Sequence, residues 1–114
     1  MWWIPSLSVI VNNIINMKFV IRAIDGERKL EKRMEVRSRH FEGMDRMKEH
    51  LVCAGGLLDE EGNLKGSVLV MDFQSRQELD EYLAHEIYVL EHVWEKITVD
   101  QMNVAYLDGK KVTK

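Results

Sequence analysis

Two segments of this chain are apolar on both faces, and this limits the folds that the chain can adopt. Residues 18–25 and 66–73 are rich in β-branched and other apolar side chains, so both are predicted strands. In each segment the apolar residues fall on odd and on even positions. A strand of this kind is usually covered on both faces. The fold must therefore supply two covers for one sheet.

The order of the predicted elements indicates how those covers are supplied. Strands and helices follow the order strand, helix, strand, strand, helix, strand, at residues 18–25, 28–50, 51–58, 66–73, 75–85 and 94–107. This order predicts an α+β, ferredoxin-like βαββαβ domain with a four-stranded antiparallel sheet. Both helices then cover one face of the sheet. A second copy of the sheet is the simplest cover for the other face, so we expect a homodimer.

Local patterns add detail to this prediction. Apolar residues at helical spacing predict the core-facing stripe of the long helix, namely Leu30, Met34, Phe41, Met44 and Leu51. Ser75 and Glu78 have the spacing of a capping box, which predicts the start of the second helix. Gly55 and Gly56 interrupt the second strand and indicate a bulge or a close approach of the backbone. The fold therefore has several sequence signals that agree with one another.

Residues 1–16 differ from the rest of the chain. They carry no charged side chain and hold two tryptophans and the single proline. They are too few to span a bilayer as a helix and lack the basic start of a secretory signal. Three interpretations stay open: a start codon assigned too far upstream, a poorly ordered extension, or an apolar arm that packs on a partner subunit. We expect the domain to occupy residues 17–109, followed by a basic tail over 110–114.

Composition excludes some classes of partner. Sixteen Lys and Arg residues against 19 Asp and Glu residues give a net charge of −3, without the basic excess typical of nucleic-acid binders. We therefore expect no nucleic-acid partner, and no membrane partner. The single cysteine, Cys53, cannot form an internal disulfide and fits a reducing compartment, so a cytoplasmic location is expected. Cys53 lies in an apolar strand, which favours a core residue over a nucleophile.

One charged residue conflicts with a plain core. Arg37 falls in the middle of the predicted apolar stripe, and Arg33 and His40 lie near it at positions i−4 and i+3. A charge on a core-facing stripe is costly unless it is paired. One interpretation is that Arg37 extends along the stripe and pairs with a carboxylate of the sheet or a loop. The other is a site for a carboxylate or another oxyanion, with His40 as an acid/base group.

Other candidate sites are weaker. His85, Glu86 and His92 are close in sequence, but their spacing matches no standard zinc motif, so no metal site is predicted. The chain also lacks a Walker loop, a dinucleotide-binding glycine motif and a nucleophile elbow.

The chain resembles the YciI-like family over residues 17 to about 107. The resemblance is carried by the order and spacing of short matches at Met17–Val20, Glu31–Arg33, Val36–Arg37, His40, Gly55–Leu58, Gly66–Ser67, Ser75–Glu78, Tyr88–Val89 and Val93–Glu95. It implies a dimeric α/β barrel made of two ferredoxin-like units, with a pocket between helix and sheet. In the family a helix histidine pairs with the aspartate of an Asp-Pro-Tyr-like segment. Here these positions correspond to His40 and Glu86, and Ile87 replaces the proline.

The resemblance also implies roles for individual residues and a class of reaction. His40 and Glu86 are the expected catalytic pair, and Arg37, Ser67 and Tyr88 are expected to bind substrate. Some family members are thought to be lyases or dehydrochlorinases, which implies a lyase or isomerase acting on a small anionic molecule without a cofactor. The alternatives are a non-catalytic binding module and an accessory dimer with a buried Arg/His/Glu network.

Overall fold

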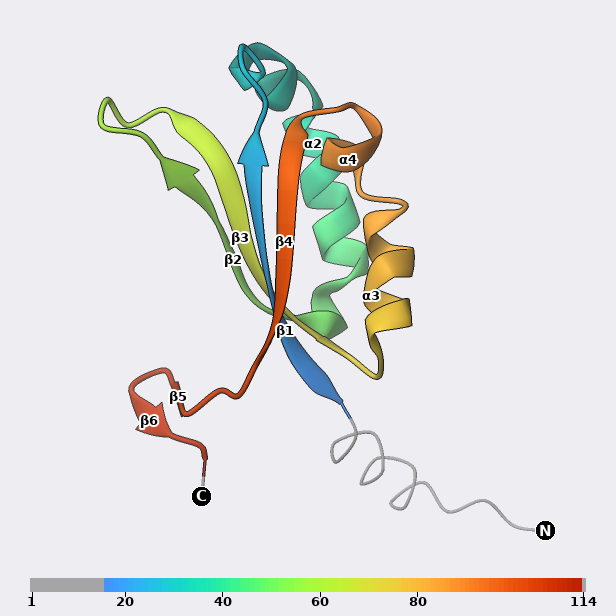
Figure 1. Cartoon of the computed structure of the whole chain (residues 1–114), viewed down its shortest axis with the longest axis vertical. Coiled ribbons are helices and arrows are strands. Elements are labelled where there is room, and N and C mark those ends of the chain that lie inside the picture. The colour runs from blue at the N-terminus through green and yellow to red at the C-terminus, as the bar shows by residue number, and fades with distance from the viewer. Residues whose placement is uncertain (1–15, 114) are drawn as a thin grey trace, which may run out of the picture.

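The computed structural model describes residues 16–113, and the fold is the predicted α+β arrangement. Four antiparallel strands form one sheet in the order β2-β3-β1-β4. They are β1 (Met17–Asp25), β2 (Leu51–Leu58), β3 (Leu64–Phe73) and β4 (Trp94–Met102). The helices α2 (Leu30–Arg46), α3 (Arg76–Leu83) and α4 (Ile87–Leu90) all lie against one face of the sheet (Figure 1). The ferredoxin-like prediction is therefore confirmed.

The predicted boundaries differ from the structure at the long helix and at the last strand, because β4 ends at Met102 and the prediction placed the strand within residues 94–107. Helix α2 ends at Arg46, and a 3-10 turn over Lys48–His50 leads into β2. The capping box is present, since the Ser75 hydroxyl accepts a hydrogen bond from the Glu78 amide at 3.1 Å. A short hairpin follows β4, with β5 (Tyr106–Leu107) inside the range of the expected last strand and β6 (Lys110–Lys111) inside the expected tail. The expected extension lies outside the described residues, apart from Asn16.

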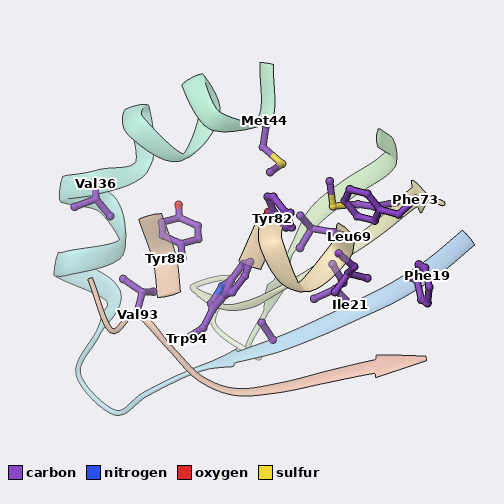
Figure 2. Close-up of a cluster of buried hydrophobic side chains, with 13 residues drawn as sticks. Phe19, Ile21, Val36, Met44, Leu69, Phe73, Tyr82, Tyr88, Val93 and Trp94 are labelled. Carbon is purple, nitrogen blue, oxygen red and sulfur yellow. The ribbon is translucent and has the colours of Figure 1, made fainter. Parts of the chain in front are cut away.

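The core lies between the sheet and the helices. From the sheet it takes alternate residues of β1 and β3, and from the helices it takes one row of each, as Figure 2 shows for Ile21, Leu69, Val36 and Tyr82. The alternation leaves Val20, Ile24, Val68 and Val70 on the helix-free face. The middle of that face is thus apolar, as predicted, but the face also carries Lys18, Arg22 and Asp72. The proposed cover is a second copy.

The predicted inward stripe of α2 is wrong at three of its positions. Leu30, Met34 and Phe41 are 38%, 48% and 49% exposed. Met44 is buried as predicted, but the other buried residues of the helix are Arg33, Val36 and His40. Hydropathy alone placed the wrong row inward because two polar side chains of the buried row, Arg33 and His40, find partners inside the domain. A paired polar group can be buried at little cost.

The prediction for Cys53 is also wrong. Strand β2 is an edge strand that pairs only with β3, and Cys53 is exposed there. An apolar sequence does not distinguish an edge strand from a central one, and the edge position leaves the side chain open.

Candidate active site

Four polar side chains lie almost completely inside the domain. Arg33, His40, Ser67 and Glu86 are each at most 7% exposed. Buried polar groups of this kind require hydrogen-bonding partners. Each of the four has close polar neighbours, and together these contacts define the candidate site.

Arg33 connects the first turn of α2 to the sheet. Its Nη1 donates to both carboxylate oxygens of Asp25, at 3.0 and 3.1 Å, and its Nη2 donates to the Ser67 hydroxyl at 2.9 Å. Its guanidinium carbon lies 4.8 Å from the centre of the Tyr88 ring. Burial raises the pKa of the Asp25 carboxyl, and the charge of Arg33 partly opposes this rise. The charge of Arg33 is therefore largely balanced within the protein.

His40 and Glu86 lie in contact. The His40 Nδ1 is 2.7 Å from Glu86 Oε1, although the contact lacks the alignment of a hydrogen bond. Hydrogen bonds between catalytic groups are often misaligned until substrate binds. Glu86 precedes α4 and accepts hydrogen bonds from the Tyr82 hydroxyl at 2.8 Å and from the Tyr88 amide at 3.2 Å. The contact leaves Nε2 as the ring nitrogen available to a ligand.

Tyr88 completes the packing around the histidine. Its ring stacks on His40 with centres 4.1 Å apart and planes 14° apart, and Trp94 meets both rings edge-on. Burial raises the pKa of the Tyr88 hydroxyl. The aromatic rings hold the imidazole plane in one orientation.

A cavity of about 260 Å³ opens beside these residues, between α2, β2, β3 and Tyr88. His40, Arg33, Arg37 and Ser67 contribute polar groups to its wall, and Phe41, Met44, Leu64 and Leu69 contribute apolar ones. Glu86 is absent from the wall and lies behind His40. The cavity is smaller than the 300–1,000 Å³ typical of sites for drug-sized ligands. It suits a small ligand.

The structure thus brings the predicted site residues together but changes their roles. The sequence predicts Arg37 as the arginine of α2 that faces the core. In the structure the buried arginine of α2 is Arg33. Arg37 is partly exposed, and its guanidinium carbon lies 4.9 Å from the centre of the Phe41 ring. Within residues 16–113 it has no carboxylate partner at ion-pair distance. Arg37 is therefore the cation of the cavity wall whose charge stays unbalanced.

Sequence reasoning missed two residues of this network. The sequence patterns place Asp25 only at the end of a predicted strand, and they place Tyr82 only within the second predicted helix. Neither has a local signal, because each becomes a partner only when β1 meets α2 and when α3 meets α4.

The weak metal candidate of His85, Glu86 and His92 does not form, since residues 16–113 contain no cluster of His, Cys, Asp and Glu side chains suited to a metal ion. No helix in the same range is long and apolar enough to cross a membrane.

Comparison with solved structures supports the fold. The chain is similar to the 5-chloro-2-hydroxyhydroquinone dehydrochlorinase TftG from Burkholderia phenoliruptrix AC1100, solved in complex with 2,5-dihydroxybenzoquinone. The TM-score is 0.71 and the identity 19%, over 76% of this chain and 94% of TftG. A proposed antibiotic biosynthesis monooxygenase from Bacteroides thetaiotaomicron VPI-5482 aligns with a TM-score of 0.53 and 12% identity, over 82% of this chain and 92% of that one.

Sequence comparison gives the family. A search of curated proteins finds no match. Residues 17–103 match the family described as the YCII-related domain, and this range holds the complete four-stranded sheet, the helices and every residue of the candidate site. The chain therefore belongs to the YCII-related domain family.

Proposed function

We propose that this chain is a cofactor-independent lyase or isomerase that acts on a small anionic organic molecule. The observation that carries the proposal is the position of His40, which lines the cavity on one side and contacts the Glu86 carboxylate on the other. A histidine supported in this way is suited to accept a proton and to return it. Glu86 orients the ring and balances the imidazolium charge that forms.

The charge of Arg37 is the reason for proposing an anionic substrate. It lies on the cavity wall without a carboxylate partner among the described residues, whereas Arg33 is paired with Asp25. An oxyanion of the substrate would supply the missing counter-charge, and a guanidinium suits carboxylates and enolates. Ser67 and Tyr88 also line the cavity and are placed to contact the same ligand.

The proposed reaction requires only proton transfer and charge stabilisation. His40 removes a proton from a carbon next to a carbonyl or carboxylate group, and Arg37 stabilises the oxyanion that develops. In a lyase the electron pair then expels a leaving group from the neighbouring carbon. In an isomerase His40 returns the proton to another carbon. TftG, the similar fold, is named a dehydrochlorinase, which is compatible with a lyase-type reaction.

The experiment is a ligand screen followed by two variants. Thermal unfolding of the full chain is measured with a panel of small carboxylic acids and with 2,5-dihydroxybenzoquinone. Arg37→Met should abolish the stabilisation that a bound acid gives, because it removes the unbalanced cation. His40→Ala should abolish turnover of any substrate found while the protein stays folded. Arg39→Met is the matched control, since Arg39 lies on the exposed side of the same helix.

The accessory-dimer alternative has one observation in its favour, because His40 and Glu86 are both more than nine-tenths buried. A buried polar pair also occurs in proteins where it only specifies packing. If His40→Ala and Arg37→Met both mainly unfold the protein and no acid in the panel binds, the residues form a structural network and the enzymatic proposal is wrong.

A further inference from the structure

The side chain of Glu86 can adopt several conformations, and only some of them bring its carboxylate to His40. A glutamate has three rotatable side-chain bonds, and Ile87 follows it, so no proline ring restrains the next backbone unit. A contact of 2.7 Å with His40 requires one side-chain conformation out of several. The structure must therefore hold this carboxylate by other means.

A competing environment lies close by. A groove of about 540 Å³ runs between α2 and α3, and both Glu86 and Tyr82 contribute to its wall. The same groove is lined by Arg39 and Arg46, whose side chains are exposed. Glu42, Glu78 and Glu81 line it too, so a carboxylate that rotated toward the groove would gain water among neighbours of both charges, and would lose its contact with His40. Burial against His40 thus needs compensating hydrogen bonds.

Two donors supply them. The Tyr88 amide is part of the α4 backbone and bonds Oε2, while the Tyr82 hydroxyl bonds Oε1, the same oxygen that faces His40. The Tyr82 ring is itself fixed, because it is 8% exposed and packs on the Phe73 ring with centres 6.2 Å apart and planes 27° apart. The hydroxyl therefore has a defined position, set by the core and independent of the ligand.

We propose that Tyr82 is a positioning residue, whose hydroxyl holds the Glu86 carboxylate against His40 and away from the groove. This inference rests on the proposed function for its purpose, but its geometry belongs to the free protein. Burial and the adjacent carboxylate raise the pKa of Tyr82, so the hydroxyl stays a donor throughout the neutral range. Tyr82 touches no substrate and acts only through Glu86.

The test uses the full chain without ligand. Ring ¹⁵N NMR reports which nitrogen of the neutral His40 carries the proton, and the His40→Ala spectrum assigns the signals. In the natural protein we expect the proton on Nδ1, toward Glu86. Tyr82→Phe keeps the ring and removes the hydroxyl, and it should shift the tautomer ratio toward Nε2 by about tenfold, as expected on losing one hydrogen bond to a charged group. Tyr106→Phe, on an exposed hairpin, should leave the ratio unchanged.

A double variant separates positioning from a general loosening of the fold. Glu86→Gln should shift the same ratio, and adding Tyr82→Phe to it should have no further effect, because the hydroxyl then has no carboxylate to hold. Additive shifts, or an unchanged ratio in Tyr82→Phe, would overturn the inference. If Tyr82→Phe does not fold, an unchanged ratio in Glu86→Gln alone overturns it. A shifted ratio in a protein that binds no acid would support Tyr82 and refute the proposed function.

Discussion

Arg33 Nη1 lies 3.0 Å and 3.1 Å from the two carboxylate oxygens of Asp25, and both side chains are about 95% buried. This pair joins the end of β1 to the first turn of α2. It allows the charged guanidinium of Arg33 to be buried. It also leaves Arg37, and not Arg33, as the arginine of α2 that lines the cavity without a carboxylate partner among the described residues.

Breaking this pair should destabilise the fold strongly. Asp25→Asn leaves the Arg33 guanidinium buried with only Ser67 and the Tyr88 ring, and removing one partner of a buried pair typically costs about 3–5 kcal/mol. Urea unfolding measures the change. Asp80→Asn is the control, because it breaks the exposed pair with Arg76, worth about 0.5 kcal/mol. Equal losses of unfolding free energy in the two variants would show that the buried pair stabilises the fold no more than the exposed pair does.

The helix-free face of the sheet should bind a second copy. Sedimentation at micromolar concentration should give about twice the chain mass of 13.4 kDa. Val20 lies at the centre of this face, opposite Val70, so Val20→Lys should give a folded monomer. Leu90→Lys, on an exposed position of α4, should leave the dimer intact. A monomeric natural chain would rule out the dimeric barrel.

Alkaline pH should weaken the fold through Tyr82. The folded state raises the pKa of its hydroxyl above the usual value of 10.0, so the folded protein keeps a proton that the unfolded chain releases. Stability that is complete below pH 10 is then lost as pH rises, by about 1.4 kcal/mol per unit. Tyr82→Phe should reduce this slope between pH 10 and 11 in urea unfolding. Parallel profiles for the two proteins would contradict the prediction.

The first 16 residues should be dispensable for folding. The family match and β1 both begin at residue 17. A chain that starts at Met17 should therefore keep its unfolding temperature and its state of association, measured by calorimetry and sedimentation. A large loss of either would show that residues 1–16 pack as an arm.

Sequence patterns predicted the fold well because they are repeated over many residues. Strand β2 and the Ser75 cap appear where their patterns place them, and the order of elements leaves few ways to build one antiparallel sheet. The orientation of α2 was not predicted correctly, because its hydropathy is ambiguous. Leu30, Met34 and Phe41 make one plausible inner face, and Arg33, Val36 and His40 make another that becomes favourable only with polar partners present.

The sequence by itself determined the order of strands and helices, the apolar residues in the middle of the second face of the sheet and the pairing of His40 with Glu86 by family resemblance. Only the tertiary structure decided that Arg33 is the buried arginine and that Asp25 balances it. It also decided that Arg37 lines the cavity without a carboxylate partner among residues 16–113, and that Tyr82 bonds Glu86. Periodicity reports the environment of neighbouring residues along one element. Charge pairing depends on distances between elements remote in sequence, and these distances are set when the sheet and helices pack.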